Sequence, residues 1–560
     1  MSSISIAFVQ SKNEIELISS RFKESVIFVP LNLFSQSYLE LNKKKYINPI
    51  DYIDNKFHKV SIDFTESFLN KIQYGDIKYQ GLKTEFKSKI RFVLNSCIFL
   101  SELLDSLSDK FEIKNLIISG WHGKNYQKYK SSETHMSSLI LSKINKKFNY
   151  IYLSDDYKNI NIPINNSKYF FKEKNIKKES ILLNNLGYNF IRIMFYKKLN
   201  MPVYLLNFSN NNIGFIKQIA LKFLGLKILK ANKIKSEKTE KLEIPNIKFI
   251  YKNYDFSDVI NIRKNELEYL LLDDENKINA LDKINNKKNF KYYFSFSSRG
   301  VDGSIPEILN NDNTKSVNIS HGTVSKAFDE NDLMYKKIIS ESVFSGRFNY
   351  FSIQTKICME SLKNTNKNIV SFIKTGNLIF ANTKNTKIKK NVLYATTLKN
   401  FHGLQFLGVE MFYEFFRNLK IFEEISKKKG FKFIINIHFT HKKCMEMLKK
   451  IFPNLVFTSE KIDNLIKNSF VTISYSSTSI EDSLVNKVPV ILFDNWKRYK
   501  HCDATTNPQY SNAPIYYINT PKDLSTCLEV LKAKYNTINF EKVIYDSNLN
   551  KNFKNFFRSL

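Results

Sequence analysis

The segment Val317–Thr323 places a histidine directly after an apolar run. Val317–Ser320 is typical of a buried strand, and His321 and Gly322 follow it. In an open parallel sheet, ligands bind beyond the carboxyl ends of the strands, and a glycine at that point permits a sharp turn. An imidazole there can accept the proton of an attacking hydroxyl near neutral pH. The segment predicts His321 as a general base, although an isolated His-Gly pair is also what closes an ordinary strand.

A second segment joins an apolar run to hydroxyl groups and a cation. The run Asn391–Ala395 is followed by Thr396, Thr397 and Lys399. Hydroxyls and backbone N–H groups in a loop between a strand and a helix suit a phosphate group. The segment predicts part of a phosphate site, and an ordinary polar loop is the alternative.

A third segment is richer in such groups. The apolar run Val471–Ser474 leads into a serine-rich turn that opens a helix, and Glu481 stands about one turn inside that helix. A Ser or Thr at a helix N-cap, with N–H groups behind it, makes a site for a diphosphate. The residues that would hold it are Ser476, Ser477 and Thr478. The carboxylate of Glu481 could then reach ribose hydroxyls, and a capped helix without a ligand is the alternative.

A fourth segment, Phe431–Ile437, is another predicted strand that ends in a histidine. His438 is followed by His441 and Cys444 at a spacing found in zinc sites. No fourth ligand accompanies them, so we expect no metal here. A carboxylate pair in Ser154-Asp155-Asp156 could hold a metal in another enzyme class, but such pairs are usually solvated turns.

The elements that must position these groups alternate between short apolar runs and helical patterns, which is typical of α/β layers with parallel sheets. Residues Phe86–Leu107 and Leu407–Lys428 have helical spacing. Two stretches, Lys230–Lys241 and Asn382–Lys390, have the composition of joints. The second predicts a domain boundary, giving domains 1–384 and 385–560, with roughly 160–290 as an insertion in the first. The predicted strands are Ser3–Val9, Ser25–Val29, Asn115–Ser119, Tyr150–Leu153, Pro202–Asn207, Tyr292–Phe296, Val317–Ser320, Asn391–Ala395, Phe431–Ile437, Val471–Ser474 and Val490–Phe493. Because helices separate the last four runs that follow the boundary, we expect them to be parallel strands of one sheet.

The composition narrows the class of protein. The chain has 560 residues, 43% of them hydrophobic, which excludes global disorder, and 15 Gly and 11 Pro exclude a collagen-like chain. Five scattered cysteines favour a reducing compartment. The sequence begins without a signal-peptide pattern and has no apolar run long enough to span a bilayer.

The net charge of +33 attracts nucleotides, nucleic acid or anionic lipid headgroups, although codon usage can account for part of it. No nucleic-acid-binding motif accompanies the charge, which argues against nucleic acid as a partner. The stretch Asn189–Lys230 mixes large apolar residues with cations. Because its lysines point around a helix rather than along one face, we favour a core helix and strand there over a membrane-surface element.

The order of the four segments resembles bacterial surface-polysaccharide transferases, the group of capsule glycosyltransferases and CDP-glycerol glycerophosphotransferases with the GT-B fold. The resemblance covers residues 317–494 and fades before residue 290. It rests on His321-Gly322-Thr323, Tyr394-Ala395-Thr396-Thr397-Leu398-Lys399, His438, and Tyr475-Ser476-Ser477 with Glu481 and Pro489. It implies two Rossmann-like domains facing each other across a cleft, with an enlarged N-terminal half.

The resemblance also implies roles. His321 would be the catalytic base on the acceptor hydroxyl, His438 would contact the donor phosphate, and Glu481 would hold the ribose. The hydroxyls of Ser476, Ser477, Thr478, Thr396 and Thr397, with Lys399, would complete the donor site. No cofactor or metal is expected, since helix N-termini and cations can stabilise the leaving nucleotide. The partners implied are a nucleotide sugar and a glycan or lipid-linked acceptor, and the location is cytoplasmic, at the inner face of the plasma membrane.

Three departures from the family pattern qualify these roles. Thr396 replaces a proline, Lys399 replaces an arginine and so loses its bidentate fork, and Phe439 replaces the proline after the histidine. Glu481 is the residue expected of enzymes that use nucleotide sugars, which favours sugar transfer. The alternatives are glycerophosphate transfer from CDP-glycerol and, in another class, an inactive basic protein that binds a membrane surface or a polyanion.

Overall fold

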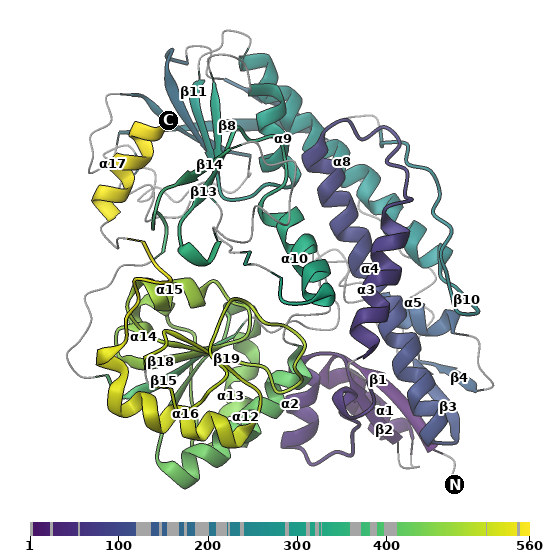
Figure 1. Ribbon diagram of the computed structural model, residues 1–560. Coiled ribbons are helices and arrows are strands. Elements are labelled where there is room, and N and C mark those ends of the chain that lie inside the picture. The colour runs from purple at the N-terminus through teal and green to yellow at the C-terminus, as the bar shows by residue number, and fades with distance from the viewer. Residues whose placement is uncertain are drawn as a thin grey trace.

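The computed structural model of the protein contains three sheets and a two-stranded ribbon among the residues that it describes. These residues are 4–22, 26–53, 56–118, 136–144, 148–153, 167–172, 176–184, 201–208, 221, 225–235, 240–285, 290–309, 314–319, 324–325, 327–358, 371–380, 389–396, 411–510, 512–545 and 549–560. Figure 1 shows a four-stranded sheet near the N-terminus in purple to blue, an eight-stranded sheet in blue to green, and a six-stranded sheet in green to yellow. The described part of the chain has no helix that is both long and apolar enough to cross a membrane.

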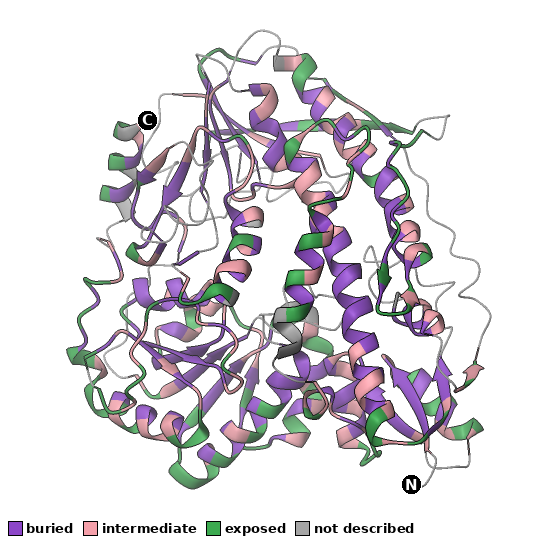
Figure 2. Cartoon of the chain, turned by 45° about the vertical axis from the view of Figure 1, so that its right-hand side comes forward, coloured by how far each residue is buried: buried purple, intermediate pink, exposed green. Residues whose placement is uncertain are grey.

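The first sheet has the strand order β2-β1-β3-β4, and its pairs are parallel. Its strands are β1 (Ile4–Val9), β2 (Val26–Pro30), β3 (Ile113–Ile118) and β4 (Asn149–Tyr152). Its connections contain α1 (Lys12–Arg21), α2 (Leu33–Leu41), η1 (Pro49–Asp51), α3 (Lys56–Leu69), α4 (Gln80–Lys110) and α5 (Met136–Lys143). The α4 helix extends beyond the predicted span at both ends and is buried along much of its length, as Figure 2 shows.

The eight-stranded sheet has the order β14-β13-β12-β11-β6-β7-β8-β5, parallel except for the edge pair β5–β8. Its strands are β5 (Ser167–Phe171), β6 (Ser180–Asn184), β7 (Val203–Asn207), β8 (Leu226–Lys235), β11 (Phe290–Ser295), β12 (Lys315–Asn318), β13 (Tyr350–Ile353) and β14 (Phe372–Lys374). The ribbon of β9 (Ile250–Tyr251) and β10 (Tyr254–Asp255) lies apart from this sheet, and the helices are α8 (Ser257–Asn285), α9 (Gly300–Leu309) and α10 (Glu330–Val343). Successive residues of β6 point to opposite faces of the sheet, and Leu182 and Leu183 belong to different apolar clusters. Both faces of the sheet are therefore covered.

The sequence predicted a joint and an insertion in the region that forms this sheet. The stretch Lys230–Lys241 is no simple joint, because β8 continues through it to Lys235 and pairs with both β7 and β5. Strands β5–β8 of this sheet come from the region 160–290 that the sequence suggested as an insertion. The boundary at residue 384 lies outside the described residues, as does most of Asn189–Lys230, so the domain limits stay predictions.

The six-stranded sheet has the order β17-β16-β15-β18-β19-β20, and each neighbouring pair is parallel. Its strands are β15 (Asn391–Ala395), β16 (Lys432–Asn436), β17 (Val456–Thr458), β18 (Ser469–Ser474), β19 (Val490–Phe493) and β20 (Ile515–Ile518). The surrounding helices are α12 (Phe412–Lys429), η5 (Phe439–Cys444), α13 (Met445–Ile451), α14 (Ile462–Ile466), α15 (Ser479–Val485), α16 (Pro521–Lys534) and η6 (Tyr535–Thr537). The prediction of four parallel strands in one sheet is confirmed. The chain therefore has two Rossmann-like α/β halves, and its N-terminal half is enlarged by the four-stranded sheet.

The last helix, α17 (Leu549–Ser559), returns from the six-stranded half to the eight-stranded sheet, as Figure 1 shows. Phe556 is fully buried in the cluster that contains Phe294 of β11, and the rings of the two residues lie 5.6 Å apart. The chain thus passes between the two halves twice.

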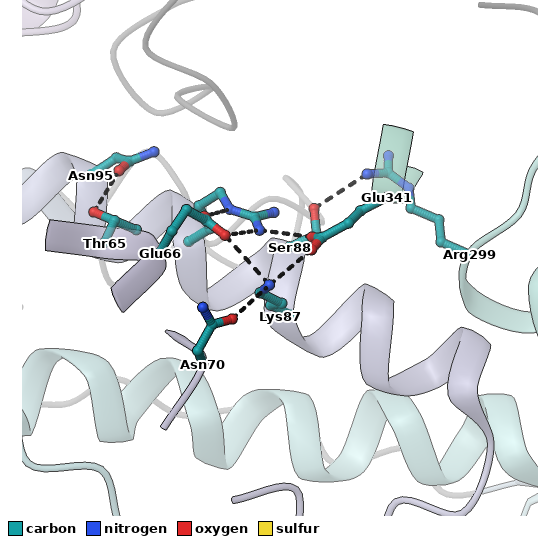
Figure 3. Close-up of polar contacts among 9 residues, drawn as sticks. Thr65, Glu66, Asn70, Lys87, Ser88, Asn95, Arg299 and Glu341 are labelled. Carbon is teal, nitrogen blue, oxygen red and sulfur yellow. Dashed lines mark hydrogen bonds and ion pairs between the residues drawn. The ribbon is translucent and has the colours of Figure 1, made fainter. Parts of the chain in front are cut away.

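An ion-pair network fixes α10 to α3 and α4 (Figure 3). Arg91 donates to Glu66 at 2.5 and 3.0 Å and to Glu341 at 2.9 Å. Lys87 contacts Glu341 at 2.9 Å and Glu66 at 3.4 Å. Arg91 and Glu66 are buried, so their charges depend on each other rather than on water. The network holds α10 against the N-terminal helices.

We expect Arg91→Met to lower the free energy of unfolding by about 3–5 kcal/mol, because it leaves Glu66 buried without its main partner. The matched control is Lys12→Met, which removes the pair of Lys12 and Glu16, both about half exposed, and should cost about 0–1 kcal/mol. Denaturant unfolding of both variants measures the difference. Equal losses would contradict a structural role for the network.

Candidate functional site

Three predicted donor segments meet at the carboxyl edge of the six-stranded sheet. Strands β16, β15 and β18 are neighbours in that order, so the residues that follow them lie side by side. The hydroxyl of Thr396 donates to the carbonyl of Asn436 at 3.1 Å, and the hydroxyl of Ser474 donates to the carbonyl of Ala395 at 2.9 Å. These bonds tie the three strand ends together. Thr397 and Lys399 lie outside the described residues.

His438 follows β16 and is exposed. Its carbonyl accepts the N–H of His441 at 2.9 Å, which folds the chain into η5. Cys444 is buried, and burial raises the pKa of its thiol to about 12. Within the described ranges, no group of three His, Cys, Asp or Glu side chains is arranged to hold a metal ion.

The serine-rich turn joins β18 to α15. Ser476, Ser477 and Thr478 are half-buried, and the hydroxyl of Ser477 accepts the N–H of Ser479 at 3.2 Å. Thr478 is the N-cap residue, but its side chain makes no capping hydrogen bond. The capping role is therefore taken by Ser477 rather than by the N-cap residue itself. The hydroxyl of Thr478 does not cap the backbone of its own helix.

Glu481 lies in the first turn of α15 and is completely buried. Its Oε1 atom lies 3.4 Å from Nε2 of His501, whereas its Oε2 atom is buried without a hydrogen-bond partner. Leaving a buried acceptor without a donor costs about 1–3 kcal/mol, which makes an empty carboxylate oxygen unusual inside a protein. Sequence reasoning placed Glu481 where a ligand could reach it, but this structure covers it with the chain around His501.

The segment that covers Glu481 is held by Asp494, the first residue after β19. Its carboxylate accepts the N–H groups of Trp496, Arg498 and Tyr499 at 3.1, 2.6 and 2.9 Å, and the hydroxyl of Tyr517 at 3.1 Å. Burial raises the pKa of Asp494, and these four donors lower it in part. Asp494 thus folds the chain back over the sheet edge and directs it towards His501.

His501, which contacts Glu481, was not predicted from the sequence. No motif marks it, and it follows Glu481 by 20 positions in a loop without periodicity. The rule that ligands lie beyond the carboxyl ends of strands applies to β19 as well, and the histidine in the loop after that strand was the available signal.

The predicted base comes from the other half of the molecule. His321, Gly322 and Thr323 follow β12 but lie outside the described residues, so the distance from His321 to the donor segments stays a prediction. Just before them, the amide of Asn318 is buried with both polar atoms unpartnered. Just after them, the hydroxyl of Ser325 donates to the carbonyl of His501 and accepts from Lys336 at 2.8 Å. The chain that carries His321 therefore touches the six-stranded half directly.

A cavity of 680 Å³ opens beside this contact, with walls from both halves. Three lysines line it: Lys356, Lys374 and Lys542. Lys356 follows strand β13, and Lys374 is the last residue of β14. Ser325 and Thr505 contribute hydroxyl groups. None of the described donor residues predicted from the sequence lines this cavity, so it adjoins the predicted donor site without coinciding with it.

A scan against protein-family models and a search of curated proteins gave no match. Similar solved structures include S. aureus TarM in complex with UDP, at 12% identity over 68% of this chain and 99% of TarM, with a TM-score of 0.40. The wall teichoic acid polymerase TagF matches at 12% identity over 69% of this chain and 90% of its own, with a TM-score of 0.37. A Listeria monocytogenes protein named as a UDP-N-acetylglucosamine 2-epimerase matches at 9% identity over 68% and 98% of the two chains, with a TM-score of 0.39.

Proposed function

We propose that this protein is a glycosyltransferase that moves a sugar from a nucleotide-activated donor to a surface glycan or a lipid-linked acceptor at the inner face of the plasma membrane. The observation that carries the proposal is Glu481. It is a fully buried carboxylate with one unpartnered oxygen, and it stands at the sheet edge where the predicted phosphate-binding residues converge. A ribose hydroxyl supplies the donor that this oxygen lacks.

The proposed reaction divides between the two halves. His321 accepts the proton of the acceptor hydroxyl, whose oxygen forms a bond to the anomeric carbon of the sugar. The bond from that carbon to the phosphate oxygen breaks, and the nucleoside diphosphate leaves with the electron pair. The hydroxyls of Thr396, Thr397, Ser476, Ser477 and Thr478, with His438 and Lys399, bind the diphosphate and stabilise its charge. The proposal gives no part to a metal ion.

A second candidate is glycerophosphate transfer from CDP-glycerol. The cavity between the halves favours it, because Lys356, Lys374 and Lys542 suit an acceptor that itself carries phosphate. The net charge of +33 is also suited to contact with anionic lipid in either case.

We expect one nucleoside diphosphate to raise the melting temperature of the protein far more than the others. The test compares CMP, CDP, UDP, GDP and CDP-glycerol, each once with EDTA and once with Mn²⁺. A ligand at 100 times its dissociation constant stabilises the native state by about 2.7 kcal/mol. A shift confined to CDP and CDP-glycerol would favour the second candidate, a shift that needs Mn²⁺ would contradict a metal-independent site, and no shift with any nucleotide would contradict the proposed function.

A further inference from the structure

His501 is fixed from three directions. Its Nδ1 atom lies 3.3 Å from the hydroxyl of Tyr499, its Nε2 atom faces Glu481, and its carbonyl accepts a hydrogen bond from Ser325 of the other half. Only 5% of its surface is exposed. An imidazole held at both ring nitrogens and at its own backbone has one orientation available.

The contact with Ser325 is itself anchored. Ser325 accepts from the ammonium group of Lys336, which is completely buried and also contacts Asp332 at 2.8 Å. The same ammonium group lies 4.6 Å from the centre of the Phe328 ring. Buried charges with several partners are rigid, because each lost contact leaves an unsatisfied group in a dry environment. The backbone of His501 is therefore held by a chain of contacts that starts on α10.

His501 occupies only one oxygen of Glu481. The 3.4 Å contact engages Oε1 and leaves Oε2 without a partner. Oε2 is therefore the oxygen that a ligand hydroxyl would take once the covering chain admits it, and Oε1 can keep its contact with His501. If His501 only replaced an absent ligand at Glu481, we would expect it to contact both carboxylate oxygens, and it contacts Oε1 alone.

We infer that His501 is a positioning residue for the donor, which orients the Glu481 carboxylate so that Oε2 can accept a ribose hydroxyl. The inference rests on the proposed function, since it names the residue that prepares the proposed donor site. Because Ser325 belongs to the N-terminal half and holds the backbone of His501, that half also helps to keep the Glu481 carboxylate in place.

Two substitutions of His501 distinguish the effect of its hydrogen bond to Glu481 from the effect of its side-chain volume. His501→Phe keeps an aromatic ring but removes the donor to Glu481, whereas His501→Gln keeps an N–H group at a similar reach. We expect His501→Phe to weaken donor binding by about tenfold and His501→Gln by less than threefold, with kcat at saturating donor unchanged in both. Calorimetric titration with UDP, CDP and GDP measures the affinities. Activity with the donor of the best-bound nucleotide gives KM and kcat separately.

Tyr335→Phe is the matched control. Its hydroxyl is buried in the same interface without a partner, and its ring packs edge-on against Tyr499 at 6.3 Å. We expect this variant to bind nucleotides like the wild-type protein. A melting curve of each variant shows whether it is folded, and His501→Gln remains informative if His501→Phe fails to fold.

The outcomes distinguish the inference from the function on which it rests. If Glu481→Gln weakens nucleotide binding and His501→Phe does not, the positioning role is overturned while the proposed function stands. If His501→Phe or His501→Gln binds nucleotide more tightly than the wild type, the histidine blocks the site instead, and the inference is overturned. If the wild-type protein binds no nucleotide, the proposed function itself fails.

Discussion

Replacement of His321 with alanine is expected to lower the rate of sugar transfer by about 10²–10⁴, the usual contribution of a general base. His321 follows the last residues of β12 and belongs to a segment of the N-terminal half whose continuation, at Ser325, contacts the six-stranded half directly. Steady-state turnover at saturating donor and acceptor measures the effect. Nucleotide affinity should not change, because the role assigned to His321 concerns the acceptor hydroxyl.

Two further variants show whether the loss of rate comes from the loss of a base at His321. His321→Asn keeps a hydrogen-bonding side chain but cannot take up the proton, so it should be as slow as His321→Ala. His441→Ala removes a histidine of the six-stranded half that has no assigned role, and this variant should keep its activity. An active His321→Ala protein would move catalysis to another residue, such as His438 or His122 in the N-terminal half.

Replacement of Glu481 with glutamine is expected to reduce donor affinity by about 10–100-fold. A hydrogen bond to a charged group contributes about 1.5–3 kcal/mol, and 1.4 kcal/mol is a factor of ten in affinity. The loss should be the same for the intact donor and for the free nucleoside diphosphate, because the ribose is common to both. Acceptor affinity should be unchanged.

Asp482→Asn is the control for this experiment. Asp482 is the neighbouring carboxylate on α15, is half-exposed, and accepts through its backbone carbonyl from the side chain of Asn486. If the role of Glu481 were only to interact with the helix dipole, about 0.3–1 kcal/mol would be at stake and both variants would lose little. Equal, small losses in calorimetric titrations would falsify the ribose assignment.

The four inner strands of the six-stranded sheet were predictable because their local and global signals agree, whereas the edge strands β17 and β20 were not predicted. Strands β15 and β19 coincide with the apolar runs Asn391–Ala395 and Val490–Phe493. A strand that is covered on both faces is apolar along its whole length, so it can be recognised as an apolar run in a single sequence. The convergence of Thr396, His438 and the serine-rich turn at one edge followed from parallel pairing alone.

Other features depend on pairs far apart in the sequence. The runs that form β1–β4 were recognised as strands, but nothing local shows that they make a sheet of their own. The network of Arg91 with Glu341 joins residues 250 positions apart, and the contact of Ser325 with His501 joins residues 176 apart. Such contacts have no period or spacing in the sequence, which is why the covering of Glu481 was not foreseen.

The double passage of the chain between the halves limits how the molecule can open. One passage runs from β14 to β15, and the other runs from η6 to α17 past the end of β13, where Lys356 donates its backbone N–H to Val543 at 3.1 Å. The halves also share one continuous apolar core, in which Phe99 of α4 stacks on Tyr413 of α12, so their separation would expose apolar surface as well as strain both connections. A protease cut in one connection should therefore leave the two halves associated, because the shared core still joins them.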